Sequence, residues 1–388
     1  MASGSDERGH VTGNPSSVGD MSAAEPVHHS PLHERHEAAG AKFAPFAGWL
    51  MPLEYTGVRS EHTAVRTAVG LFDVSHLGTL EVRGSGVVTA LNSLFTNDLS
   101  RIGLGQAQYT MLCDDAGVVV DDLIVYLLGD DVVLLIPNAA NSAAVAAAVR
   151  EAVGSDAEVS DLHHDRAIIA VQGPAAGQVL TDAGVSADLD YMQVARAQVG
   201  DVDVIVCRTG YTGELGYELV VPARDAVAVW GRLVVAGGPH ALALCGLGAR
   251  DTLRTEMGYP LHGQDLGGEF GPVETGMGWA VGWGKDEFRG RSVLMERRAS
   301  GLVPRLRGLV MIDRGVPRAG MAVHLMPEGP QVGTLTSGTF SPTLGCGVAL
   351  GVLDRTVTPG DEVSVNVRGR WLSARVTATP LVESHVRA

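Results

Sequence analysis

The chain contains 388 residues, of which 45% are hydrophobic and 19% charged, and its formal net charge at pH 7 is -15. A chain of this length exceeds one ordinary hydrophobic core, so we expect two or three domains packed together. The acidic balance argues against a nucleic acid as the main partner, and no run approaches the roughly 20 apolar residues of a membrane-spanning helix.

The N-terminal residues 1–30 have the composition of a disordered tail. They are rich in Gly, Ser, Pro and acidic residues, and they lack the basic start and apolar stretch of a secretory signal. His28 and His29 would suit a metal ion, but two adjacent histidines in a flexible segment usually bind nothing specific. Ordered structure is therefore expected from residue 31 onward.

Residues 31–300 alternate between strand-like and helix-like segments, beginning with a short amphipathic helix within 31–43. Strands are predicted at 78–84, 118–128, 132–138, 167–173, 202–210 and 217–222, and helices at 140–153, 175–184 and 224–237. Glycines at the ends of the last two helices suit left-handed caps. Strands that follow one another through tight turns favour antiparallel mixed sheets over a doubly wound parallel sheet, so the predicted fold class is α+β.

The C-terminal residues 301–388 have a different pattern. From about residue 305, helical periodicity gives way to short, closely spaced strand-like segments separated by Gly and Pro. Such spacing predicts a small β-barrel or sandwich. We therefore expect a tail (1–30), a main region of two interleaved α+β subdomains (31–300) and a C-terminal β domain (301–388).

Asp121 and Asp122 interrupt the apolar run VVVDDLIVYLL. Neighbouring side chains on a strand point to opposite faces, so at least one carboxylate is pressed toward a buried side, where an unpaired charge is costly. One interpretation is a functional carboxylate with a shifted pKa that can exchange a proton with a ligand nitrogen. The other is a solvated strand end or a pair with an Arg, and the residues alone leave both open.

Two further segments carry polar residues in patterns that suit a ligand pocket. In RTGYTGELGYELVVP (208–222), glycines at three-residue intervals allow close backbone approach to a flat ligand, although most Gly-rich hairpins are only hairpins. In GLGARDTLRTEMGYPLHGQDL (246–266), Arg250 and Arg254 lie on adjacent positions of a short helix that ends at Gly258. Either arginine could grip a carboxylate, and a surface ion-pair network is the simpler alternative.

The chain lacks the usual motifs of nucleophilic and metal catalysis. No G-x-S-x-G or H-E-x-x-H is present, and His76 and His262 have no second His or Cys at metal-ligand spacing, so they are interpreted as satisfied core or loop residues. We predict no metal. The four cysteines are far apart and form no C-x-x-C, which favours reduced thiols and a cytoplasmic protein.

Taken together, the motifs resemble one family. FAGWLMPLEY, LFDVSHLG, QYTML, GVVVDDLIVY, AVQGP, RTGYTGELGYE, LGARDTLRTEMGYPLHG, GPVETGMGWAV and LTSGTFSPTL occur in the order and wording of the glycine-cleavage T-protein family. The resemblance covers roughly residues 31–383, and the conjunction of motifs is far more specific than any one of them.

The resemblance implies a three-domain, ring-like architecture with tetrahydrofolate bound in its centre. Asp122 matches the family's essential Asp beside the pterin nitrogen that receives the carbon unit, and Arg387 is a loose match to a site residue near the C-terminus. The other matches to positions that line the folate site are Tyr109, Tyr191, Tyr211, Glu218, Arg250 and Tyr259.

The resemblance also implies the reaction, which is transfer of a one-carbon unit from the S-aminomethyl-dihydrolipoyl arm of the H-protein to tetrahydrofolate, with release of ammonia. In this scheme Asp122 orients the pterin and stabilises positive charge, with proton transfer as a second role. Glu218 is assigned to the N–H edge of the pterin, and Arg250 to a polar group or to charge balance. No protein nucleophile is needed.

Two alternatives share this fold. One is the folate module of a dimethylglycine or sarcosine dehydrogenase, but no strand-turn-helix G-x-G-x-x-G precedes residue 50 to suggest a flavin domain. The other is a non-enzymatic folate-binding or iron–sulfur assembly factor. Those relatives carry a Lys-Gly-Cys-Tyr loop, whereas this chain has RTGYTGELGYE without the Cys.

Overall fold

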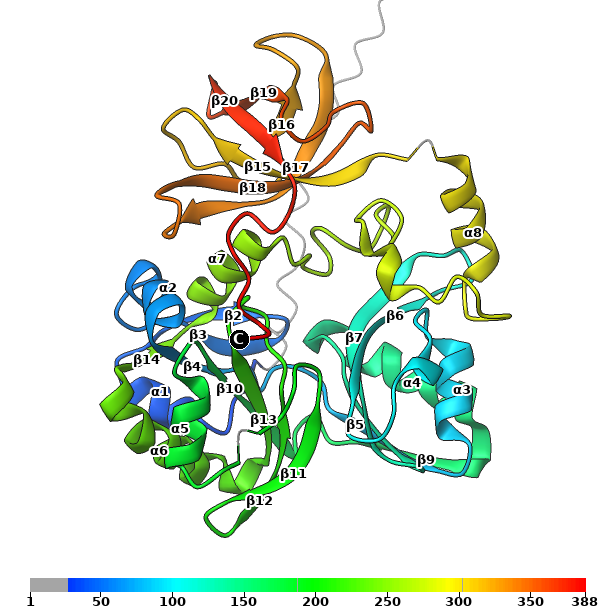
Figure 1. Ribbon diagram of the computed structural model, residues 1–388, viewed down its shortest axis with the longest axis vertical. Coiled ribbons are helices and arrows are strands. Elements are labelled where there is room, and N and C mark those ends of the chain that lie inside the picture. The colour runs from blue at the N-terminus through cyan, green and yellow to red at the C-terminus, as the bar shows by residue number, and fades with distance from the viewer. Residues whose placement is uncertain (1–26, 187, 302) are drawn as a thin grey trace, which may run out of the picture.

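The fold consists of two α+β halves side by side with a β-barrel above them (Figure 1). This computed structural model describes residues 27–388 except 187 and 302. Each half contains one sheet with helices on its outer side, and the two sheets face each other. The predicted α+β class with a C-terminal barrel is confirmed.

The first half is built on a six-stranded sheet in the order β11-β12-β13-β10-β4-β14. All neighbouring pairs are antiparallel except β4 and β14, which are parallel. Helices α5 and α6 pack on one face, where alternate strand residues form an apolar core. The bounds are β4 Val69–Asp73, β10 Arg166–Gln172, α5 Ala176–Asp182, β11 Val194–Val199, β12 Val202–Cys207, β13 Gly216–Pro222, α6 Ala226–Gly237 and β14 Leu242–Cys245.

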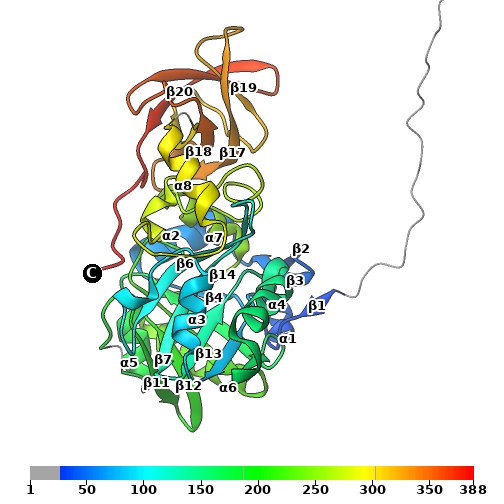
Figure 2. The same ribbon diagram turned by 90° about the vertical axis from the view of Figure 1, so that its right-hand side faces the viewer.

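The second half is built on a five-stranded antiparallel sheet in the order β6-β7-β8-β5-β9. Helices α3 and α4 cover its outer face, which is turned toward the viewer in Figure 2. Residues on the opposite face, such as Tyr126 and Leu134, share a core with the first sheet. The bounds are β5 Leu80–Gly84, α3 Val87–Leu94, β6 Ala107–Cys113, β7 Val119–Gly129, β8 Val132–Ile136, α4 Ser142–Val153 and β9 Ala157–Asp161.

The third body is a closed barrel of six strands in the order β15-β18-β17-β16-β19-β20. A helix, α8 (Arg291–Ser300), precedes it, and the residues after β20 run back down to the lower body (Figure 1). Closure removes exposed strand edges and gives the barrel its own apolar core. The strands are β15 Arg305–Met311, β16 Ala322–His324, β17 Gln331–Ser341, β18 Cys346–Leu353, β19 Glu362–Val367 and β20 Arg370–Thr377.

The N-terminal segment forms a small sheet and two helices against the first half. The elements are β1 His28–His29, α1 His33–Ala38, β2 Lys42–Phe46, β3 Trp49–Glu54 and α2 Val58–Thr67, with strand order β1-β3-β2. Asp73 anchors the start of this segment, since its buried carboxylate accepts hydrogen bonds from Ser30 and, at 2.8 Å, from His36. Four of the residues assigned to a disordered tail, 27–30, are thus part of the fold, while 1–26 lie outside the described residues.

One detail of the helix predictions needs correction. The helix predicted at 224–237 does not end at a left-handed glycine, because the chain continues into a 3-10 turn and reverses at Ala241, whose φ is 54°. By contrast, Gly184 after α5 and Gly258 after α7 (Leu247–Met257) have φ values of 85° and 70°. The backbone path after α6 is set by packing of β14 against β4, which local periodicity does not encode.

Arg254 on α7 joins the body to the barrel through buried ionic contacts. Its guanidinium lies 2.7 Å from Asp265 and donates at 2.9 Å to Ser337 of β17. Arg254 is only 2% exposed and Asp265 is fully buried, so the simpler alternative of a surface ion-pair network is wrong at this position. A buried charge left without its partner is strongly destabilising, so this contact holds the barrel in place.

We predict that Arg254→Met lowers the free energy of unfolding by about 3 kcal/mol or more, because Asp265 would keep a buried charge without its cation. Denaturant unfolding of the full chain measures this. The control is Arg375→Met, which removes an exposed barrel ion pair between Arg375 and Glu362 and should have little effect. Equal effects for the two variants would contradict the assignment.

Candidate functional site

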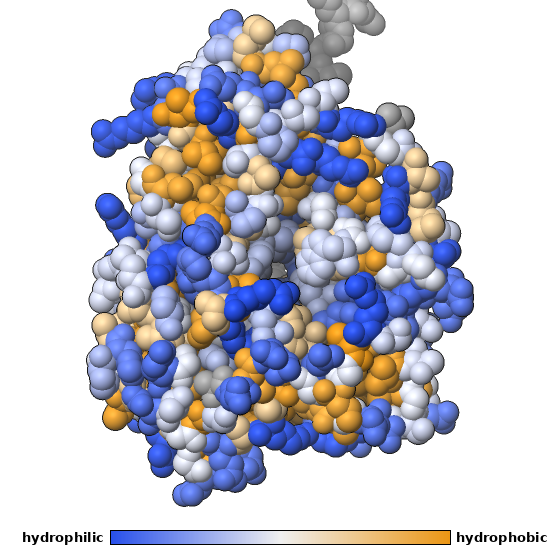
Figure 3. Space-filling model, in the orientation of Figure 1, coloured by the Kyte–Doolittle hydropathy of each residue, from blue (hydrophilic) through white to orange (hydrophobic). Residues whose placement is uncertain are grey.

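A cavity of about 680 Å³ lies between the two halves of the body. In the space-filling view, the surface is hollowed near the centre of the face shown, below the barrel (Figure 3). Residues from both halves of the body line it, including β6, β7, β13 and α7, together with the C-terminal segment. The cavity brings together all of the site residues proposed from the sequence, namely Tyr109, Asp122, Tyr191, Tyr211, Glu218, Arg250, Tyr259 and Arg387.

Strand alternation explains why two of these acids face the cavity. On β7, Leu123 and Val125 point into the core under α3 and α4, so Asp122 and Ile124 point the opposite way, toward the first sheet. On β13, Tyr217 and Leu219 point into the core under α5 and α6, so Glu218 also faces inward. The two facing sheets therefore present one carboxylate each to the same space.

Asp122 is held by two hydrogen bonds. The hydroxyl of Tyr109 on β6 donates to Oδ2 at 2.8 Å, and the side-chain amide of Asn138 donates to Oδ1 at 3.0 Å. Burial raises the pKa of Asp122, while the bond from Tyr109, the nearby His262 and the bond from Asn138 act in the opposite direction. The carboxylate is therefore fixed in position, and its pKa lies above the ordinary value of an aspartate.

Asp121 lies on the other face of β7 and is fully buried. It accepts hydrogen bonds from the backbone N–H of Asn138 at 3.0 Å and from the side-chain amides of Asn138 and Asn141 at 2.9 and 2.7 Å. Burial, followed by the charge of Asp122, raises the pKa of Asp121 to about 7. Within residues 27–388 as described, no arginine pairs with either acid, which removes the interpretation of a solvated or Arg-paired strand end.

Arg250 and the two tyrosines beside it form one wall. The Arg250 guanidinium lies 4.7 Å from the centroid of the Tyr211 ring, and the Tyr211 and Tyr259 rings are 5.6 Å apart. The Tyr211 hydroxyl donates to the carbonyl of Pro260 at 2.6 Å, which fixes the ring. In the described part of the chain the guanidinium makes no hydrogen bond or ion pair, so its donors are free to meet a ligand in the cavity.

Glu218 of β13 also lines the cavity. Its Oε2 accepts a hydrogen bond of 2.6 Å from the hydroxyl of Thr209. Burial lowers the pKa of Arg250, and the charge of Glu218 acts against that lowering, which places the two groups within electrostatic reach. The carboxylate keeps lone pairs with which to accept N–H groups of a ligand.

The C-terminal segment closes one side of the cavity. His385 donates its backbone N–H to Gly213 at 2.7 Å, and its imidazole lies 3.1 Å from the carboxylate of Glu214. Arg208 donates to the carbonyl of Ala388 at 3.3 Å. These contacts place the Arg387 guanidinium 5.2 Å from the ring centroid of Tyr191. A residue whose sequence match was loose thus lies among the other site residues.

Several lining residues were not proposed from the sequence. Trp279 is 61% exposed at the rim, with its ring centroid 5.4 Å from that of Tyr109, and Asn138 contacts both carboxylates of β7. The run IPNAAN after a strand was the signal for Asn138, because asparagines in a turn often bond neighbouring polar groups. An exposed Trp carries no comparable pattern in sequence.

The two histidines interpreted as satisfied also line the cavity. His262 is hydrogen-bonded, to Asn141 at 3.0 Å and to the carbonyl of Val119 at 3.3 Å. His76 is buried, and its Nδ1 has no hydrogen-bond partner among the described residues, so that half of the interpretation is wrong. Burial lowers the pKa of His76 to about 3, which keeps the ring neutral.

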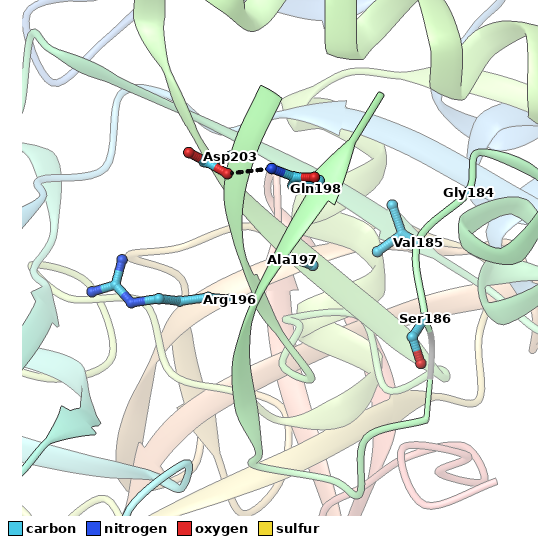
Figure 4. A pocket seen from close by; sticks show the side chains of 7 residues that line it. All are labelled: Gly184, Val185, Ser186, Arg196, Ala197, Gln198 and Asp203. Atoms are coloured by element: carbon cyan, nitrogen blue, oxygen red, sulfur yellow. Dashed lines mark hydrogen bonds between the residues drawn. The ribbon is translucent and has the colours of Figure 1, made fainter. Parts of the chain in front are cut away.

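A second depression lies beside the β11–β12 hairpin but holds no comparable chemistry. It is shallow, and of its side chains Gln198 and Asp203 are hydrogen-bonded to each other, while Arg196 projects away from Val185 and Ser186 (Figure 4). In the described residues, no group of His, Cys, Asp and Glu side chains has the arrangement of a metal site. The central cavity is therefore the candidate functional site.

The fold and the cavity define an enzyme-like α+β protein that can hold a flat, polar small molecule between carboxylates, tyrosines and an arginine. The model of the GCVT N-terminal domain matches residues 32–285, and that of the glycine cleavage T-protein C-terminal barrel domain matches residues 305–383. The chain belongs to the glycine cleavage T-protein family.

Relatives of known name support the same family across nearly the whole length. An aminomethyltransferase of Parafrankia sp. is 54% identical over 92% of this chain and 98% of its own, and one of Mycobacterium bovis is 50% identical over 95% and 100%. The crystal structure of aminomethyltransferase T of the Bartonella henselae glycine cleavage system superposes with a TM-score of 0.87, at 35% identity, over 92% of this chain and 99% of that one. The predicted family and aminomethyltransferase function are confirmed.

We predict that Tyr109→Phe raises the pKa of Asp122 further, because the lost hydroxyl donates to and stabilises the ionised carboxylate. Carbon-13 NMR titration of aspartate carboxyl groups measures this, with the Asp122 signal assigned from its absence in Asp122→Asn. The control is Tyr55→Phe, which removes a hydroxyl from a half-buried tyrosine that is bonded to His36 outside the cavity. A titration of Asp122 unchanged in Tyr109→Phe would refute the prediction.

Proposed function

We propose that the central cavity binds tetrahydrofolate and that the chain transfers to it the aminomethyl carbon carried on the dihydrolipoyl arm of the H-protein, releasing ammonia. The observation that carries this proposal is the Asp122 carboxylate, half-buried at the cavity wall and held by Tyr109 and Asn138. Family membership supplies the reaction class, and the geometry supplies the groups that this reaction requires.

The residues of the cavity fit a folate. Its volume of about 680 Å³ lies within the range of pockets for drug-sized ligands. Glu218 offers acceptors for the N–H edge of a pterin ring, and the tyrosine wall offers aromatic surface to pack against it. Arg250 and Arg387 offer guanidinium donors for polar or anionic groups.

In this reaction the chain's own residues need only position the substrates and stabilise the charge that develops on them. When bound, tetrahydrofolate supplies the amine that attacks the electrophilic carbon, so the absence of a serine or cysteine nucleophile among the described cavity residues is consistent with the reaction. Asp122 orients the amine and stabilises positive charge that develops near it. The raised pKa of Asp122 also suits it to accept a proton.

The same proposal assigns the partner and the compartment. The carbon donor is the lipoylated H-protein, and the exposed Trp279 beside Tyr109 marks a rim that a protein-borne arm could contact. Three of the four cysteines are buried, none forms a disulfide and no described helix is long and apolar enough to cross a membrane. Reduced thiols support a cytoplasmic enzyme.

We predict that Asp122→Asn lowers the rate of transfer by about a hundredfold or more, because the isosteric amide cannot carry negative charge or accept a proton. Production of ammonia and methylenetetrahydrofolate from aminomethylated H-protein, with and without tetrahydrofolate, measures the rate. Asp131→Asn, at an exposed Asp in the β7–β8 turn, is the matched control and should keep normal turnover. Near-normal turnover in Asp122→Asn would remove Asp122 from the reaction.

A separate prediction concerns Glu218. Glu218→Ala should weaken tetrahydrofolate binding about tenfold or more, because N–H groups of the pterin edge would lose a charged acceptor. Calorimetric titration measures the dissociation constant. Glu158→Ala, at an exposed strand position, serves as the control and should bind normally. An unchanged dissociation constant for Glu218→Ala would exclude Glu218 from the pterin edge.

A further inference from the structure

We propose that Asp121, which does not face the cavity, is a positioning residue for the transfer reaction. Its carboxylate holds the side-chain amides of Asn138 and Asn141, and these two amides in turn fix Asp122 and His262 at the cavity wall. The inference rests on the proposed function, in which Asp122 acts on the bound folate. It assigns a role to the buried acid that the reaction itself leaves unused.

Asn138 is the first link. Its backbone N–H donates to Oδ2 of Asp121 at 3.0 Å, and its side-chain nitrogen donates to Oδ1 of Asp121 at 2.9 Å. The same nitrogen lies 3.0 Å from Oδ1 of Asp122 and 2.9 Å from the Asp122 carbonyl. Because Asp121 accepts one N–H of this amide, the other N–H is directed at Asp122, where the carbonyl and Oδ1 share it.

Asn141 is the second link. Its side-chain nitrogen donates to Oδ1 of Asp121 at 2.7 Å and lies 3.0 Å from Nδ1 of His262. An amide nitrogen can only donate, so Nδ1 of His262 is the acceptor in this contact, and Nε2 lies 3.3 Å from the carbonyl of Val119, to which it donates. Asp121 thereby orients both amides that touch the cavity's acid and its imidazole.

The two acids are coupled by charge as well as by geometry. The titratable groups that face the pair are Tyr109 from β6, Tyr211 from the loop before β13 and His262 from the segment after α7. Among the described residues no lysine or arginine is bonded to either acid. Burial and the charge of Asp122 raise the pKa of Asp121, and because such an interaction is mutual, negative charge on Asp121 makes Asp122 harder to ionise.

A purely structural role for Asp121 makes a different prediction. Asp121 also ties down the residues that lead into α4, so its loss could lower stability without touching the chemistry. In that case activity would fall only as far as the folded fraction falls, and the pH dependence of turnover would keep its wild-type midpoints. A positioning role instead changes the pH profile and the turnover of the folded enzyme.

The test is Asp121→Asn in the full chain, assayed with aminomethylated H-protein and tetrahydrofolate across pH. We expect kcat to fall about tenfold to a hundredfold, because misaligned catalytic groups cost rates of that order. The dissociation constant for tetrahydrofolate should change little. The acidic limb of the pH profile should move to lower pH, since removing a neighbouring negative charge lowers the pKa of Asp122.

Matched variants keep the outcomes distinct. Asp131→Asn is the control, and NMR titration of Asp122 in the absence of substrates should show the same downward pKa shift as the profile. If Asp121→Asn does not fold, Asn141→Ser, which removes the amide that joins Asp121 to His262 and leaves Asn138 in place, must lower kcat in a folded protein with its tetrahydrofolate affinity retained. A wild-type rate and profile in the folded variant, or a loss that follows stability alone, overturns the inference.

Failure of this inference is distinguishable from failure of the proposed function. If Asp122→Asn abolishes transfer while Asp121→Asn behaves as wild type, only the role of Asp121 is lost. If Asp122→Asn keeps near-normal turnover, the proposed role of Asp122 falls, and the role of Asp121 falls with it.

Discussion

Burial of two adjacent carboxylates on β7 is the constraint on which the site depends. A carboxylate removed from water must receive hydrogen bonds or lose its charge, and here the donors are asparagine amides and a tyrosine hydroxyl rather than cations. Uncharged donors leave the pKa of both acids raised. An arginine in the same place would have made Asp122 a permanently ionised structural residue.

The remaining architecture serves to close a cavity around that strand. Two sheets face each other so that each contributes an inward carboxylate, and the barrel is tied to the body by buried charges on α7. Arg66 on α2 adds a second tie, since it pairs with Glu214 and Glu256, and Glu256 also accepts from Thr343 beyond β17. These contacts fix where the barrel sits, and so where the chain after it must run.

Part of the site could be predicted because the direction of its side chains depends only on neighbouring residues in the chain. Period-two alternation on β7 and β13 determines that Asp122 and Glu218 each point away from the helix-covered core, whatever the rest of the chain does. Motif order then linked Tyr109, Tyr211 and Arg250 to the same pocket. Asn138 and Trp279 were not predicted as site residues, because their roles depend on contacts with residues on other strands and turns.

By itself, the sequence determined the fold class, the family, the faces of the strands and the acid at the centre of the site. Only the tertiary structure showed that Asp121 is connected to the cavity residues by hydrogen bonds through Asn138 and Asn141. It also decided how residues 27–30 join the fold and that Arg387 lies beside Tyr191. The physical reason is how far apart in the chain the interacting residues lie. Strand alternation is set by neighbours in the chain, whereas contacts such as that between Tyr191 and Arg387 depend on how separately folded layers pack.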